Sequence, residues 1–212
     1  MQHKKKVSVI LLIAFVLTMM IPVSAFASNF SDISSDHWAI QQIDRMNARG
    51  IIGGYEDGTV RANNPVTQFE AVLIASRMMG LEYDAEKSKG TYLPFEYPSW
   101  DGAYNSAVAA YEAGLIDASD FKHNGAASRE WITKLLIKVL NAESQLGKST
   151  SSLPFSDKDK ISAKYRDYVL LAYDKSLIGG YTDGTFKPAN TVTRAELAAF
   201  LCRVENQMDV KA

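Results

Sequence analysis

An internal repeat constrains the fold of this chain more than any other feature. Residues 52–70 align without a gap with residues 178–196, which begin 126 positions later, and 11 of the 19 aligned positions are identical. A partial copy lies between them, because Ser128-Arg129 follows Thr67-Gln68 by 61 positions and precedes Thr193-Arg194 by 65. Self-similarity at a fixed period indicates a repeat protein. The sequence therefore predicts three units, residues 28–88, 89–150 and 151–212.

Each unit contains two segments with helical periodicity, separated by a loop rich in turn residues. In the second segment of units two and three, apolar residues recur at i, i+3, i+4 and i+7, which is the pattern of one buried helix face. These residues are Ile132, Leu135, Leu136 and Val139, and Leu197, Phe200, Leu201 and Val204. The pattern predicts a mainly α-helical fold. Because a unit of ~60 residues buries little apolar surface alone, we expect the three units to share one core.

The N-terminus has the pattern of a secretory signal peptide. Three lysines, Lys4 to Lys6, precede an uncharged apolar stretch at residues 7–23, and Ala25-Phe26-Ala27 supplies a cleavage site. An uncleaved membrane anchor is the alternative, although 17 residues fall short of the ~20 that span a bilayer. We expect cleavage after Ala27 and secretion.

Charge and composition exclude several classes of function. The chain has 23 basic and 24 acidic residues, and three of the basic ones lie in the predicted signal peptide. This balance gives no general attraction to nucleic acid or to an anionic membrane. Cys202 is the one cysteine in the sequence, so neither an intrachain disulfide nor a cysteine zinc site can form. His37 and His123 have no motif partner. The sequence therefore predicts no catalytic residue, no metal and no cofactor.

Helix-capping residues open the second helical segment of each unit. Thr67 and Thr193 are each followed three positions later by a glutamate, Glu70 and Glu196, as in a capping box. Ser128 takes the same place in unit two. We interpret these residues as structural caps, and the two glutamates as caps rather than as the carboxylate pair of a glycosidase.

An arginine follows the capping residue in two of the units. Arg129 and Arg194 occupy this place, where unit one has Gln68. Capping does not require a cation, and a cation in the first turn is slightly unfavourable against the helix dipole. The planar donor group of arginine suits a carboxylate or a phosphate, with a surface ion pair as the alternative. We expect Arg194 to be the principal anion contact, and Arg129 to be weaker because the loop of its own unit is degraded.

Two equivalent loops combine glycine with tyrosine. They are Gly53-Gly54-Tyr55 and Gly179-Gly180-Tyr181, and an Asp-Gly pair that is typical of a tight turn follows each. The paired glycines would let a ligand approach the backbone closely. Tyr55 and Tyr181 are either stacking platforms for a sugar or core residues.

The combined motif resembles the S-layer homology repeat. Phe30-Ser31-Asp32, then Trp38, the Gly-Gly-Tyr-x-Asp-Gly loop and Thr-x-x-Glu stand in order in unit one, and Phe155-Ser156-Asp157 begins a closer match in unit three. The resemblance covers residues 30–205. It implies a trefoil of three helix-loop-helix units about a pseudo-threefold axis, with a shared central helical bundle and ligand grooves between the lobes. It also implies non-covalent binding to secondary cell wall polysaccharide of the pyruvylated N-acetylmannosamine type.

The resemblance further implies which residues contact the ligand. Carried onto this sequence, they are Asp32, Trp38, Gly53, Gly54, Tyr55, Arg129, Gly179, Gly180, Tyr181 and Arg194. Each unit departs from the pattern: unit two lacks the loop and has Trp131 for the glutamate, and unit three has Lys164 at the place of Trp38. We therefore expect one or two grooves to bind, and neighbouring units to complete a groove, for example by combining Trp38 with Arg129 or with Arg194.

These observations predict an anchoring protein of a Gram-positive-type cell wall or S-layer. We expect a monomer that binds polysaccharide and has no nucleic-acid partner and no membrane partner after cleavage. The alternative is a structural scaffold whose repeats bind another S-layer or wall protein.

Overall fold

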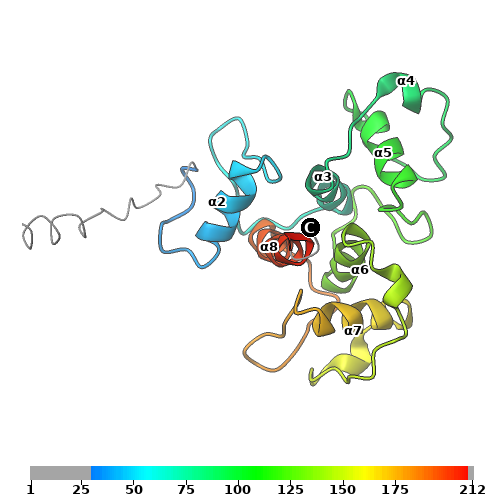
Figure 1. Cartoon of the computed structure of the whole chain (residues 1–212). Coiled ribbons are helices and arrows are strands. Elements are labelled where there is room, and N and C mark those ends of the chain that lie inside the picture. Colours follow the sequence, from blue (N-terminus) through cyan, green and yellow to red (C-terminus); the bar gives the residue numbers. More distant parts are fainter. Residues whose placement is uncertain (1–29, 210–212) are drawn as a thin grey trace, which may run out of the picture.

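The computed structural model describes residues 30–209, so the predicted signal peptide and its cleavage site lie outside the described residues. Within this range the chain is mainly α-helical, as predicted, with extended backbone limited to isolated bridges. The longer helices form an outer set and a central set of three each (Figure 1). The outer helices are α2 (Ile40–Ala48), α5 (Ala103–Glu112) and α7 (Arg166–Asp174), and the central ones are α3 (Gln68–Met78), α6 (Arg129–Val139) and α8 (Arg194–Asp209). Short helical turns are α4 (Ala85–Ser88), η1 (Glu143–Gln145), η2 (Lys158–Lys160) and η3 (Ala163–Tyr165).

The three lobes interlock, because each outer helix packs against a central helix from a different unit. Helix α2 packs on α8, α5 packs on α3, and α7 packs on α6. The first and last units are joined by Glu205 of α8, which is buried and forms ion pairs with Arg45 of α2 and with Arg49, the residue that follows α2. The lobes are therefore parts of one closed arrangement (Figure 1).

A ring of three backbone hydrogen bonds relates the units. The amide of Val66 donates to the carbonyl of Val192, the amide of Val192 donates to Ala127, and the amide of Ala127 donates to Val66, each over 3.0 Å. These residues immediately precede the capping residues that the repeat aligned. The cyclic pattern gives the described part of the chain a pseudo-threefold arrangement. The unit boundaries at residues 88 and 150 stay predictions.

The predicted apolar stripes form the shared core. The residues of both stripes, on α6 and on α8, are buried. Helix α6 is buried on nearly all sides, since ten of its 11 residues are buried. Such a helix has no solvent-facing side because the lobes surround it.

An aspartate fixes each glycine-tyrosine loop. The carboxylate of Asp32 accepts hydrogen bonds from the amides of Val60 and Arg61, both at 2.7 Å. Asp157 does the same for Phe186 and Lys187, at 2.7 and 2.9 Å. Each aspartate therefore holds the C-terminal end of its loop.

Glycine is required at two kinds of position in these loops. Gly58 and Gly184 have a φ of +76°, in the left-handed region that glycine adopts without strain. A Cβ atom on Gly54 would lie 2.4 Å from the Phe30 ring, and one on Gly180 would lie 2.9 Å from the Phe155 ring. The phenylalanine ring of each Phe-x-Asp motif thus occupies the space that a side chain at Gly54 or Gly180 would need.

Candidate functional site

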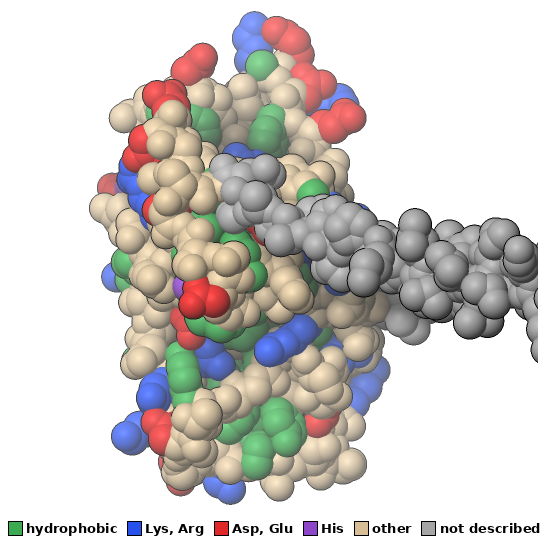
Figure 2. Space-filling model, turned by 90° about the vertical axis from the view of Figure 1, so that its left-hand side faces the viewer, with side chains coloured by type: hydrophobic (Ala, Val, Ile, Leu, Met, Phe, Trp, Pro, Cys, Tyr) green, Lys and Arg blue, Asp and Glu red, His purple; other side chains and the backbone are tan. Residues whose placement is uncertain are grey.

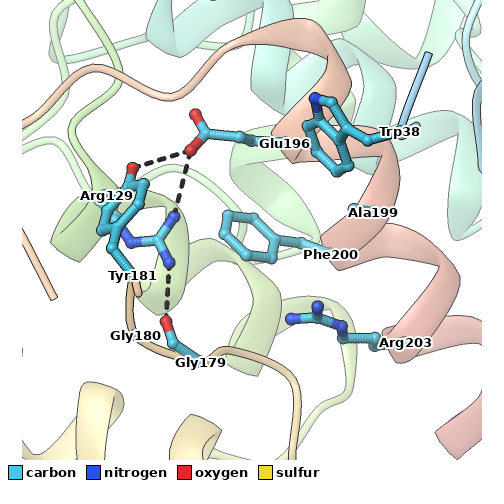
Figure 3. A pocket seen from close by; sticks show the side chains of 9 residues that line it. All are labelled: Trp38, Arg129, Gly179, Gly180, Tyr181, Glu196, Ala199, Phe200 and Arg203. Atoms are coloured by element: carbon cyan, nitrogen blue, oxygen red, sulfur yellow. Dashed lines mark hydrogen bonds and ion pairs between the residues drawn. The ribbon is translucent and has the colours of Figure 1, made fainter. Parts of the chain in front are cut away.

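A hollow of about 160 Å³ lies where parts of all three units meet (Figure 3). We call it the Arg129 groove. It is lined by Trp38, Arg129, Gly179, Gly180, Tyr181, Glu196, Ala199, Phe200 and Arg203. The combination of Trp38 with Arg129, which the sequence left as one of two possibilities, is the one that the structure forms.

Arg129 reaches from the start of α6 to the loop of unit three. Its Nη2 donates to the carbonyl of Gly179 at 2.8 Å, and its Nη1 lies 3.5 Å from a carboxylate oxygen of Glu196. The guanidinium carbon lies 4.6 Å from the centroid of the Tyr181 ring and 5.0 Å from that of Phe200. The side chain is 7% exposed, and this burial lowers its pKa. Arg129 therefore holds the loop of unit three onto α6 and leaves only an edge open to the groove.

Glu196 is both a helix cap and a wall of the groove. One carboxylate oxygen accepts from the backbone amide of Thr193 at 3.0 Å, and the Thr193 hydroxyl accepts from the amide of Glu196 at 3.3 Å. The other oxygen accepts from the Tyr181 hydroxyl at 2.8 Å. Burial and this hydrogen bond raise the pKa of Tyr181. The cap thus orients the tyrosine and the arginine that line the groove.

Trp38 and Gly179 supply the open surfaces of the groove. Trp38 is 60% exposed, and its ring is stacked on His37 with centroids 5.7 Å apart. A Cβ atom on Gly179 would meet no atom within 4 Å, whereas the adjacent Gly180 is packed against Phe155. The first glycine of the pair is therefore the one at which a ligand can approach the backbone.

The tyrosine rings of both loops are in contact with cations. Arg61 lies 3.8 Å from the centroid of Tyr55, and Lys187 lies 4.3 Å from that of Tyr181. Each of these cations also pairs with the aspartate of the Asp-Gly turn, at 2.9 and 2.8 Å. Because cations already cover part of the tyrosine rings, Trp38 offers the more accessible stacking face.

Arg194 makes a second connection between units, which we call the Arg194 site. Its Nε donates to the carbonyl of Val60 at 2.7 Å, and its Nη2 donates to that of Gly53 at 2.6 Å. Its guanidinium lies 5.0 Å from the centroid of Tyr55, and the side chain is buried. A Cβ atom on Gly53, like one on Gly179, would meet open space.

The arginines therefore pair with loops of neighbouring units and not with their own. The expectation that Arg129 is weaker because its loop is degraded was wrong in its reason, because Arg129 contacts the intact loop of unit three. The loop of unit two is instead contacted by Gln68, whose side-chain oxygen accepts from the amide of Lys122 at 2.8 Å. All three residues after the caps thus connect one unit to the next.

The remaining predicted residues have clear places. Both oxygens of Asp32 are used by backbone amides, so this side chain shapes the loop. Thr67 and Glu70 form a complete capping box, and the hydroxyl of Ser128 accepts from the amide of Trp131 at 3.3 Å. Burial raises the pKa of the Cys202 thiol, which is the opposite of activation as a nucleophile.

Sequence reasoning missed part of the groove. Ala199, Phe200 and Arg203 were not assigned to a site, and Glu196 was interpreted as a cap alone. The signal was present, since residues 196, 199, 200 and 203 follow helical spacing and share one face of α8. Phe200 was interpreted as a core residue, and its side chain is buried. The same ring also lies next to the Arg129 guanidinium in the groove.

Comparison with a family model identifies the repeated motif. The model of the S-layer homology domain matches residues 29–72 and residues 154–198. Two segments are S-layer homology matches. They contain the two glycine-tyrosine loops and the two capping boxes, and they include Trp38, Tyr181 and Glu196 of the Arg129 groove. The middle unit lies between the two matched segments, so its membership in the family stays a prediction.

Curated relatives carry similar segments. The chain is 26% identical over 209 residues to an S-layer protein of Bacillus thuringiensis subsp. finitimus, covering 97% of this chain and 25% of that protein. It is 26% identical over 214 residues to the S-layer protein sap of Bacillus anthracis, with 99% and 25% covered. It is also 26% identical over 210 residues to an endoglucanase of Bacillus sp. (strain KSM-635), with 93% and 22% covered.

The chain spans about a quarter of the length of these relatives. The S-layer homology matches and the S-layer relatives indicate a location at the cell wall or S-layer, as the sequence predicted. Every helix within residues 30–209 is too short or too polar to span a lipid bilayer.

Proposed function

We propose that this chain is a non-catalytic module that anchors to the cell wall by binding an acidic polysaccharide in the Arg129 groove. The S-layer homology matches support an anchoring role at the general level. The proposed ligand is more specific: a secondary cell wall polysaccharide that carries pyruvylated N-acetylmannosamine.

The convergence of three kinds of contact in one hollow carries this proposal. A pyruvate ketal presents a carboxylate and a methyl group on a sugar ring. The groove offers guanidinium donors for the carboxylate, the exposed face of Trp38 for the sugar, and open backbone at Gly179. Basic and apolar side chains lie next to one another on one face of the molecule (Figure 2).

The Arg194 site is a second candidate for the same ligand. It repeats the combination of arginine, open glycine and tyrosine with Arg194, Gly53 and Tyr55. We propose that both arginines contribute to anion binding through the donors that their carbonyl contacts leave over.

The arrangement of charge favours binding over catalysis. Among the residues that line the groove, Glu196 supplies one carboxylate, whereas glycoside hydrolysis generally uses two. That carboxylate is already held by Thr193, Tyr181 and Arg129.

A scaffold role, in which the repeats bind another surface protein, is the competing function. It is favoured by exposed aromatic side chains away from the groove, among them Tyr92 at 82% and Trp100 at 49% exposure. Exposed apolar side chains in one segment are a common feature of protein-binding surfaces.

Binding to three wall preparations tests these functions. Purified chain is titrated against native sacculi, sacculi stripped of secondary polysaccharide, and sacculi whose polysaccharide has been depyruvylated. We expect strong binding to the first and weak binding to the others. Equal binding to all three would contradict the proposal.

A matched pair of tryptophan variants adds a residue-level test. Trp38→Ala should weaken binding to native polysaccharide by roughly 10-fold, because stacking on an aromatic side chain contributes about 1 kcal/mol or more. Trp100→Ala should leave this binding unchanged. The reverse result, with Trp100 needed and Trp38 dispensable, would favour the scaffold function.

A further inference from the structure

The Arg129 groove contains two cations, but only one of them has a carboxylate partner among its lining residues. Arg129 lies 3.5 Å from Glu196. The bond described for the side chain of Arg203 is to a neutral group, since its Nη1 donates to the carbonyl of Leu177 at 3.2 Å. The lining residues therefore have one more positive charge than negative charge, and the excess lies on Arg203.

Arg203 is placed where a ligand can reach it. It stands on α8 seven residues after Glu196, which puts it on the same helix face two turns further on. The residue is exposed, and its guanidinium lies 5.9 Å from the centroid of the Phe200 ring, which also lies 5.0 Å from the guanidinium of Arg129. Figure 3 shows the guanidinium end of Arg203 pointing toward the side of the groove where Gly179 and Arg129 lie.

Arg129 is less able to change partners. Its two terminal nitrogens already contact Gly179 and Glu196, and its side chain is 7% exposed. Burial lowers its pKa, and the positive charge of Arg203 acts in the same direction. Moving Arg129 toward a ligand would release the loop of unit three, whereas Arg203 keeps donors free without any rearrangement.

We propose that Arg203 is the residue that determines the preference of the groove for an acidic sugar, by binding the carboxylate of the ligand. Arg129 then acts mainly by holding the loop that forms the opposite wall. This assignment rests on the proposed function, because it names the cation that selects the charged form of the polysaccharide.

The middle unit supports the distinction between a compensated and an uncompensated cation. The equivalent position on α6 is Lys138, whose Nζ donates to the carbonyl of Gly114 at 2.7 Å and lies 3.4 Å from Glu143. Arg203 makes a similar carbonyl contact, but Lys138 has in addition an acidic neighbour. A cation that already has a carboxylate partner gains less binding free energy from a carboxylate of the ligand. We therefore expect selectivity for the acidic sugar to arise at Arg203.

Three variants test the assignment in titrations against purified native and depyruvylated polysaccharide. Arg203→Gln should weaken binding to the native polymer by roughly 10- to 100-fold and should lose most of the wild-type preference for the native over the depyruvylated polymer. Arg203→Lys keeps the charge and should retain more affinity than Arg203→Gln. Arg166→Gln removes an exposed arginine from the start of α7, outside the groove lining, and should behave as the wild type.

The wild type separates failure of this assignment from failure of the proposed function. If the wild type prefers the native polymer and Arg203→Gln retains that preference, the assignment to Arg203 is wrong and the proposed function stands. If the wild type shows no preference, both are wrong. Thermal unfolding of each variant checks the fold. Should Arg203→Gln not fold, Arg203→Met also removes the charge, and an undiminished preference of that variant for the native polymer would overturn the assignment.

Discussion

The Arg129 groove and its counterpart on α6 show how one repeat position can give an open site or a closed one. The counterpart, which we call the Lys134 cluster, consists of Lys134, Asp117, Asp120 and Tyr165. On α8 the positions are Glu196, Ala199, Phe200 and Arg203, and on α6, 65 residues earlier, they are Trp131, Lys134, Leu135 and Lys138. The small Ala199 leaves a hollow, whereas Lys134 fills the equivalent space.

The Lys134 cluster neutralises its own charges. The Lys134 ammonium lies 2.8 Å from Asp117 and 2.9 Å from Asp120, and the Tyr165 hydroxyl donates to Asp120 at 2.8 Å. The hydrogen bond from Lys134 holds the pKa of Asp117 well below its usual range. The space around these residues does not admit a water molecule.

The comparison indicates what a ligand site in this fold requires. Both places contain a cation and an aromatic side chain, but only the Arg129 groove combines free volume with a cation that has no carboxylate partner among its lining residues. The choice between alanine and lysine at one helix position therefore separates a candidate binding groove from a structural ion cluster.

The largest expected effect concerns the whole molecule. Because each outer helix packs on a central helix of another unit, the open and the closed site should unfold together, in one transition. Scanning calorimetry of the purified chain should give a single peak with equal calorimetric and van't Hoff enthalpies. Separate peaks would show that the two sites belong to independent parts.

Among the single substitutions, removal of the cation from the Lys134 cluster should lower the free energy of unfolding the most. Lys134→Met would leave Asp120, whose side chain is 4% exposed, without its closest cation. Breaking a buried ion pair costs 3–5 kcal/mol, and we expect about 3 kcal/mol because Lys164 and Tyr165 still contact Asp120. Urea unfolding measures this effect.

The matched change in the open site is Arg203→Met. The Arg203 side chain is exposed and has no ion pair described. The substitution should therefore change the free energy of unfolding by less than about 0.5 kcal/mol. Similar losses of stability for Lys134→Met and Arg203→Met would contradict the contrast between the two sites.

The connecting arginines should give a smaller loss of stability. Arg194→Gln introduces glutamine, the residue that unit one has at the equivalent position, Gln68. The substitution removes the two hydrogen bonds that the Arg194 guanidinium donates to backbone carbonyls. We expect a loss of about 2 kcal/mol, together with weaker binding to native polysaccharide. Arg194→Lys keeps the charge but loses the planar donor group, so it should restore little. Unchanged stability and affinity in both variants would show that Arg194 has neither role.

The sequence was sufficient for the fold and for the local motifs. The apolar stripes predicted α6 and α8, and the Thr-x-x-Glu pattern predicted where α3 and α8 begin. These features depend on residues within one helical turn of each other, so the sequence records them directly.

The sequence could not predict which units come into contact. The repeat shows that Arg129 and Arg194 are equivalent, but the partner loop of each depends on the path of the chain through the central bundle. Arg203 was missed for a related reason, because a lone arginine on an amphipathic helix is typical of a solvent-facing position. The role proposed for it depends on Trp38 and the loop of unit three, which lie far from it in the sequence and line the same groove.

The smallest expected effect distinguishes the two caps that flank the compared sites. Thr193 forms a reciprocal capping box with Glu196, whereas Ser128 has Trp131 at the third position and makes one half of the box. Thr193→Ala should therefore lower stability by about 1 kcal/mol, and Ser128→Ala by less. Glu196 keeps its hydrogen bond from Tyr181 in the Thr193 variant, so the groove should retain its shape and its affinity for native polysaccharide. Denaturant unfolding and polymer titration of the two variants measure these effects separately. A large loss of affinity in Thr193→Ala would mean that the cap itself, and not the Tyr181 hydrogen bond, fixes Glu196 in the groove.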